Sequence, residues 1–196
     1  MDRDRIIDPS SSTVSAIKCD MSGKIVTKDI YNVVPGPGTA FLVGTAPPTQ
    51  VDFVNGIEAW EFAAGADDEV MIDWVIPRGQ KLNSVIIPRV SWSPITDINA
   101  HVEVCWALEY TIAVPGQAFS ESETIRANGV CTGSHVYEEL YLPEIPATLS
   151  GAMDVRVKGR LYRDVSEDTY TAAAAVHSVD LLIVCDGLGS TTATEK

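Results

Sequence analysis

The residues that could act in nucleophilic or acid–base catalysis are three histidines and four cysteines: His101, His135, His177, Cys19, Cys105, Cys131 and Cys185. No serine lies in a G-x-S-x-G turn, and no two cysteines form the C-x-x-C pair of zinc or redox sites. The sequence therefore predicts a protein without enzymatic activity, with its histidines on strand surfaces or in turns and its thiols reduced. A triad built from a histidine, a serine and an aspartate is the alternative.

Three carboxylates follow one another closely near the C-terminus: Asp164, Glu167 and Asp168. Carboxylates at short spacing in a turn suit a hard cation such as Ca²⁺, but this segment lacks the Asp-x-Asp-x-Asp-Gly regularity and the distal glutamate of a calcium loop. We interpret it as a solvated turn, with calcium as the alternative. No cofactor is predicted, because neither glycine-rich segment, 35–38 or 187–189, has the helix or βαβ context of a phosphate-binding loop.

The four tryptophans could include a platform on which a sugar ring stacks. Trp74, Trp92 and Trp106 are in phase with inward apolar neighbours, so they are assigned to the core. Trp60 is ambiguous and could serve either purpose.

The chain carries a formal net charge of -13 at pH 7, which disfavours binding to nucleic acid and to anionic lipid. The most apolar long segment, residues 172–185, is interrupted by His177 and Asp180 and is too short to cross a bilayer as a helix. The first ten residues contain no long apolar stretch, so no secretory signal is expected and synthesis in the cytosol is predicted. We predict no nucleic-acid partner and no membrane partner.

Apolar and polar residues alternate with a period of two over much of the chain, which is typical of half-buried strands. The clearest runs are 69–76, 102–114 and 153–163, and further candidates are 57–62, 82–92, 117–125, 135–142 and 170–185. These eight strands predict an all-β protein, an antiparallel, jelly-roll-like β-sandwich. The side chains expected to form its core are Val104, Trp106, Leu108, Tyr110, Val155, Val157, Leu161, Val179, Leu181 and Ile183. Asn128 and Gly129 are expected in a turn, Pro88 is expected to place its strand at an edge or in a bulge, and Gly159 is expected to mark a bulge or a close approach of backbone.

Before Gly56 the sequence pattern is different, because turn-forming residues there separate short apolar segments. We therefore divide the chain into an extended N-terminal attachment arm (1–55), a sandwich (56–187) and a polar C-terminal tail (188–196). Apolar side chains in an arm need a surface to bury against, either on the chain's own domain or on a neighbouring protein. The residues expected to make these contacts are Ile6, Ile7, Ile30, Tyr31, Val33, Val34, Phe41, Leu42 and Val43.

Three segments resemble the jelly-roll domains of tailed-bacteriophage virion proteins, the group of capsid decoration (cement) proteins and fibre heads. They are Asp-Trp-Val-Ile-Pro at 73–77, Val-Cys-Trp-Ala-Leu-Glu-Tyr at 104–110, and Gly-Arg-Leu-Tyr-Arg-Asp-Val-Ser-Glu-Asp-Thr-Tyr at 159–170. The resemblance covers about two-thirds of the chain and implies a homo-oligomer, often a trimer, that is bound to a capsid or a tail and has no chemistry of its own. It also implies a location in the virion, after assembly in the host cytoplasm.

The resemblance leaves two roles open. An arm followed by a compact sandwich suits a decoration protein that binds the major capsid protein or another virion protein, and it also suits a fibre that contacts host glycans. We favour decoration, because the N-terminal part shows no heptads or fibre repeats. A cupin-like metalloenzyme is a third possibility, but the three histidines are too few and lack the H-x-H grouping.

Overall fold

The computed structural model describes residues 18–19, 25–26, 30–77, 80, 84–96, 102–146 and 154–185. Their regular structure is β-strand except for one 3-10 turn, η1 (Gly38–Ala40). In these residues no helix is long and apolar enough to span a membrane.

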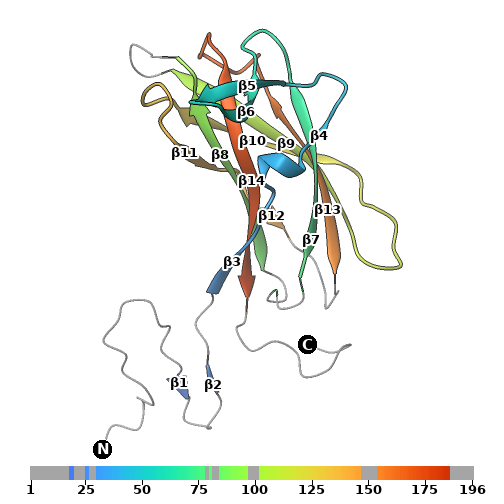
Figure 1. The fold of residues 1–196 in the computed structure, drawn as a ribbon. Helices are drawn as coiled ribbons and strands as arrows, with labels where there is room; N and C mark the ends of the chain where they lie inside the picture. The colour runs from blue at the N-terminus through green and yellow to red at the C-terminus, as the bar shows by residue number, and fades with distance from the viewer. Residues whose placement is uncertain are drawn as a thin grey trace, which may run out of the picture.

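Two antiparallel sheets face each other and form an elongated sandwich (Figure 1). The five-stranded sheet has the order β10 (Glu123–Val130), β9 (Glu103–Ala113), β13 (Val155–Arg163), β7 (Glu69–Ile76) and β4 (Leu42–Val43). The seven-stranded sheet has the order β11 (Glu138–Tyr141), β8 (Val85–Pro94), β14 (Ala174–Cys185), β6 (Ile57–Phe62) and β5 (Thr49–Val54), with β12 (Ile145–Pro146) beside β8 and β3 (Ile30–Val34) beside β14. Two further short strands, β1 (Lys18–Cys19) and β2 (Ile25–Val26), pair with each other. The predicted jelly-roll-like β-sandwich is confirmed.

The core between the sheets contains the ten side chains that the sequence analysis expected there. All ten predicted core residues are buried in one cluster, and Trp74 and Trp92 are buried with them. Each strand of the sandwich turns one face inward, so a period of two in the sequence becomes one buried row per strand.

One strand is displaced from its predicted position. Residues 117–125 were expected to form a strand that ends before a turn at Asn128 and Gly129, but β10 begins at Glu123 and includes both residues, which pair with Cys105 and Val104. A Cβ on Gly129 would lie 2.7 Å from Cζ2 of Trp92. The glycine therefore makes room for a core indole inside a strand, and does not mark a turn.

Pro88 was expected to place its strand at an edge or in a bulge, because proline cannot donate to a sheet ladder. Instead β8 lies inside the seven-stranded sheet, between β14 and the pair β11 and β12. The carbonyl of Pro88 accepts a hydrogen bond from the backbone N–H of Leu142, 2.9 Å away, so the missing donor faces the gap between β11 and β12. The prediction was wrong because the neighbouring strand is itself interrupted at this point.

Gly159 was expected to mark a bulge or a close approach of backbone, and the structure shows close approach. The residue pairs in unbroken register with Ile72 and Tyr110 on its two neighbouring strands. A Cβ here would lie 2.6 Å from Cζ3 of Trp74 and 3.0 Å from Cδ1 of Leu108. The glycine allows the Trp74 ring to lie flat against β13.

Replacing Gly159 with alanine is expected to lower the free energy of unfolding by about 1 to 3 kcal/mol, because the added methyl group overpacks a filled core. Gly65→Ala is the matched control, since a Cβ there meets no heavy atom within 4 Å, and its effect should stay within about 0.5 kcal/mol. Reversible urea unfolding measures both variants. Equal stabilities would show that the Trp74 ring does not occupy this space.

The predicted boundary between arm and sandwich at Gly56 is wrong. Strands β3, β4 and β5 all precede that residue, yet each pairs with a strand of one of the two sheets. The strands β3 and β4 pair with segments far away in the sequence, and β5 forms a hairpin with β6, so the predicted boundary falls in the turn between two paired strands. Most of residues 1–29, and all of the predicted tail at 188–196, lie outside the described residues.

Candidate functional site

A small pocket opens on the surface beside Trp60, the tryptophan whose role the sequence left open. It has a volume of about 220 Å³ and lies between η1, β5, β6 and β14. Figure 1 shows η1 lying over β14 at this place. The residues that line the pocket are Pro37, Gly38, Thr39, Gln50, Glu58, Ala59, Trp60, Val176 and His177.

The indole of Trp60 is fixed in position. Its Nε1–H donates to the carbonyl of Gly38, 2.8 Å away, and its buried side packs against the hydrophobic core. A Cβ on Gly38 would lie 2.8 Å from the carbonyl oxygen of His177, so only glycine lets η1 come this close to β14. Trp60 therefore belongs to the core and to the pocket wall at the same time.

His177 borders the pocket at a point where the register between β14 and β8 shifts, and its carbonyl oxygen faces Gly38 of η1. Its Nε2 lies 2.9 Å from the hydroxyl of Ser93. Burial lowers the pKa of His177, so the imidazole is neutral at neutral pH. The ring of Phe53 packs edge-on against it at a centroid distance of 5.0 Å, and the ring of Tyr137 stacks on it at 6.2 Å. The His177 ring therefore lies on the outer face of the sheet with Ser93 and Tyr137, whereas Trp60 pairs with the core residue Val176 and faces inward.

A polar network occupies the outer face of the same sheet. Arg89 forms ion pairs with Asp180 (2.7 Å) and Glu139 (3.0 Å), and the hydrogen bond to Asp180 raises the pKa of Arg89. Glu139 also accepts hydrogen bonds from the hydroxyls of Tyr137 and Tyr141, at 3.1 and 3.4 Å. These partners hold two exposed tyrosine rings in defined positions on the surface.

A second, wider groove lies on the five-stranded sheet. It has a volume of about 400 Å³, and its lining includes Leu42, Met71, Tyr110, Lys158 and Arg160. The guanidinium of Arg160 lies between two carboxylates, 2.7 Å from Glu69 and 2.7 Å from Glu109. Its charge is thus neutralised by the protein itself, which leaves a mostly apolar surface beside β4.

The candidate nucleophiles do not assemble into a triad. Within the described residues Ser93 is the hydrogen-bond partner of His177, but Ser93 is buried and no carboxylate bonds the imidazole. Nδ1 of His135 lies 2.6 Å from the hydroxyl of the adjacent Ser134 and its ring packs against Phe53, but no carboxylate of the described residues pairs with it. His101 lies outside the described residues. Burial raises the pKa of the Cys105 and Cys131 thiols to about 11, so neither is a thiolate at neutral pH.

The predicted calcium ligands Asp164 and Asp168 bind different side chains. Asp164 pairs with Arg126 at 2.9 Å and accepts from the hydroxyl of Ser166, while Asp168 pairs with Arg163. Over the part of the chain that the structure describes, no three histidine, cysteine, aspartate or glutamate side chains form a group that could hold a metal ion. The side chains of this turn are therefore engaged in ion pairs.

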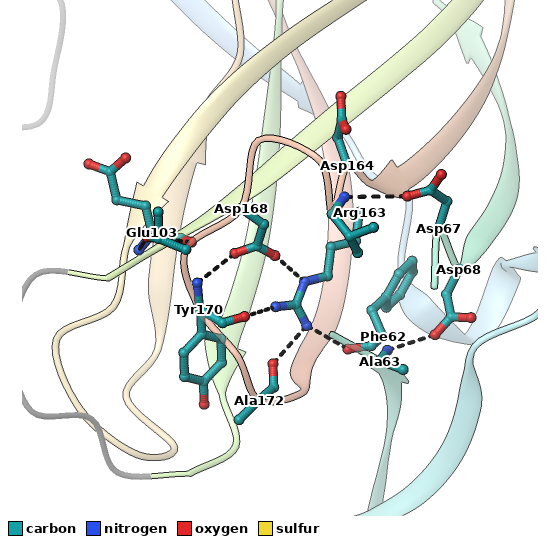
Figure 2. A network of polar contacts seen from close by, with 12 residues as sticks. Phe62, Ala63, Asp67, Asp68, Glu103, Arg163, Asp164, Asp168, Tyr170 and Ala172 are labelled. Carbon is teal, nitrogen blue, oxygen red and sulfur yellow. Dashed lines mark hydrogen bonds and ion pairs between the residues drawn. The ribbon is translucent and has the colours of Figure 1, made fainter. Parts of the chain in front are cut away.

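Arg163 is the centre of this turn and is fully buried (Figure 2). Besides Asp168, its guanidinium donates to the carbonyls of Phe62 (3.0 Å), Ala172 (2.8 Å) and Tyr170. Asp168 also accepts from the backbone N–H of Tyr170 at 2.8 Å. The network ties the loop between β13 and β14 to the end of β6, and so has a structural role.

The predicted arm residues divide into two groups. Val34 and Phe41 are buried in the chain's own core. Tyr31, Val33, Leu42 and Val43 are exposed, with 59%, 44%, 67% and 55% of their surfaces accessible. Ile6, Ile7 and the side chain of Ile30 lie outside the described residues.

The sequence pointed to Trp60 but missed its neighbour Gln50. Only the pairing of β5 with β6 places Gln50 directly opposite Trp60. The Pro-Gly-Pro-Gly segment at 35–38 was the available signal, because it permits the close approach of η1.

No protein-family model matches this sequence, and no curated protein matches it. Solved structures do match. The chain is similar to the structure of infectious bursal disease virus, Gx strain, with 10% identity and a TM-score of 0.44 over 93% of this chain and 39% of the viral chain. It is similar to the xylan-binding module CBM15, with 15% identity and a TM-score of 0.39 over 80% of this chain and 97% of the module.

A third similar structure is the enzymatically active domain of tailspike protein 4 from bacteriophage CBA120. It shows 11% identity and a TM-score of 0.34 over 78% of this chain and 19% of the tailspike chain. The chain thus spans well under half the length of the two viral structures. With identities and TM-scores this low, the comparisons assign neither a family nor an activity.

Proposed function

We propose that this protein is a structural component of a bacteriophage virion, a decoration protein that binds the capsid exterior and stabilises the particle. It acts as a homo-oligomer, which we propose to be a trimer, and its partner is the major capsid protein or another virion protein. This proposal follows the sequence resemblance, and one structural observation supports it.

That observation is the position of the exposed apolar residues of β3 and β4. The strand β4 is the edge of the five-stranded sheet, and β3 lies beside β14 at the edge of the other sheet. Exposed apolar edge strands of a β-sheet promote association with other chains, and natural proteins normally protect or cover them. Leu42 also lines the apolar groove beside β4, so one surface continues from the edge strand onto the sheet. We infer that a neighbouring protein covers this surface in the particle.

Replacing Leu42 and Val43 together with serine is expected to weaken binding to particles at least tenfold. Both side chains point to solvent, and the backbone pairing of β4 with Val70 and Met71 remains available, so stability should change by no more than about 0.5 kcal/mol per site. Cosedimentation with particles that lack the protein measures the binding.

Val130→Ser is the matched control for that experiment. Val130 is similarly exposed but lies on β10, at the opposite edge of the same sheet. The control should bind particles as the unmodified protein does. If the Leu42 and Val43 variant also binds with undiminished affinity, this edge is not the attachment surface.

The second candidate function is that of a tail- or head-fibre protein that contacts glycans on the host surface. The pocket at Trp60 favours it, because that pocket combines a fixed indole ring with polar side chains. Imaging of particles with and without the protein distinguishes the two roles, since density would disappear from the capsid lattice in one case and from a fibre in the other. In either role we propose that the protein has no catalytic activity, in keeping with the buried Ser93 and the raised thiol pKa values.

A further inference from the structure

We propose that the pocket between η1, β5, β6 and β14 binds one ring of a neutral saccharide. The inference deepens the second candidate function by naming its site and ligand class. It is independent of the attachment edge at β4, so its failure would leave the decoration role untouched.

The first argument is the shape of the pocket. Its volume of about 220 Å³ is smaller than the roughly 300 to 1,000 Å³ of sites for drug-sized ligands. It therefore has room for one ring of a longer chain, not for a whole oligosaccharide.

The second argument is the combination of an aromatic face with hydrogen-bonding groups. A pyranose ring has apolar C–H faces and a rim of hydroxyls, so it suits a flat aromatic wall next to polar side chains. Gln50 pairs directly with Trp60 across the two strands, which places its amide beside the indole. Thr39 and Glu58 line the same pocket. An amide and a hydroxyl can both donate and accept, as sugar hydroxyls do.

The third argument is that the indole is already held in place. The hydrogen bond from Trp60 to Gly38 and the packing of η1 on β14 hold the wall without a ligand. A preformed site loses little conformational entropy on binding, which matters for weak ligands such as sugars.

The fourth argument is charge, which selects the class of saccharide. Glu58 lines the pocket, no basic side chain does, and the whole chain carries a charge of -13. Sialic acid and uronic acid rings carry a carboxylate, which the negative electrostatic field of the protein repels. The charge therefore favours a neutral hexose or N-acetylhexosamine.

The test uses the full-length protein on a glycan array that carries neutral glycans with terminal glucose, mannose, galactose or N-acetylglucosamine beside sialylated and uronic-acid glycans. Binding to at least one neutral glycan is expected, with none to the acidic ones. Isothermal titration with the corresponding free oligosaccharide then gives the affinity, which should lie between micromolar and millimolar Kd.

Three variants locate the site. Trp60→Ala and Gln50→Ala should each lower the affinity about tenfold or more. Gln50 is exposed, so its variant remains informative if Trp60→Ala perturbs folding as judged by circular dichroism. The control is Phe119→Ala, which removes an exposed aromatic ring on the loop between β9 and β10 and should leave the affinity unchanged. The proposal is overturned if no neutral glycan binds, if only acidic glycans bind, or if Gln50→Ala and Trp60→Ala bind as tightly as the control.

Discussion

Replacing Trp106 with alanine is expected to lower the free energy of unfolding by about 3 to 5 kcal/mol. Trp106 has no accessible surface and lies where the two sheets meet. Its indole packs edge-on against Phe62 at a centroid distance of 5.1 Å and against Trp92 at 6.1 Å. Alanine would leave a cavity that these two rigid neighbours cannot fill, and the stability lost includes both the transfer of the indole and that cavity.

Trp106→Phe is the informative companion. In the part of the chain that the structure describes, the indole Nε1–H of Trp106 is buried without a hydrogen-bond partner. Phenylalanine keeps an aromatic ring and removes that unpaired donor, so its cost should be clearly smaller, about 1 to 2 kcal/mol. Urea unfolding followed by circular dichroism gives both values. A loss below about 1 kcal/mol for Trp106→Ala would mean that β9 turns its other face to the core.

Replacing Arg163 with alanine should have an effect of the same size, about 3 to 5 kcal/mol, for a different reason. The variant leaves the carboxylate of Asp168, of which 3% is accessible, without its cation. It also removes the donor that the carbonyls of Phe62, Tyr170 and Ala172 share (Figure 2). Buried acceptors without partners are costly because they have given up their hydration.

A double variant separates the cost of the orphaned charge from the value of the ion pair. Arg163→Leu combined with Asp168→Leu removes both charges, so it should be more stable than Arg163→Ala alone. Thermal and urea unfolding at neutral pH measure the series. Both variants lose the contacts of Arg163 with the carbonyls, so if the double variant is the less stable of the two, Asp168 stabilises the loop through the Tyr170 N–H even without its cation, and the unpaired carboxylate is not the main cost.

The sequence by itself determined the strands and the core. Seven of the eight predicted strands lie within a few residues of their predicted positions, the eighth is displaced to Glu123–Val130, and every predicted core residue is buried. This success has a local cause. A strand in a two-layer sandwich must bury alternate side chains. Each strand segment therefore shows a period of two in its own sequence, whichever strands lie beside it. The absence of a glycine-rich phosphate loop and of metal-ligand spacing could be read in the same local way.

Only the tertiary structure decided where the sandwich begins and what its surface presents. The strands β3 and β4 are too short to show a clear alternation and pair with segments far away in the sequence, whereas β5 forms a hairpin with β6. The structural roles predicted for Gly129 and Pro88 were wrong because these roles depend on groups far away in the sequence. For Gly129 the group is the Trp92 ring, and for Pro88 it is the interruption between β11 and β12. The pocket at Trp60 likewise draws its walls from four separate elements. Local patterns determine which face of a strand is buried, whereas long-range pairing determines which strands become neighbours. A surface site is built from neighbouring strands, so it depends on the long-range pairing.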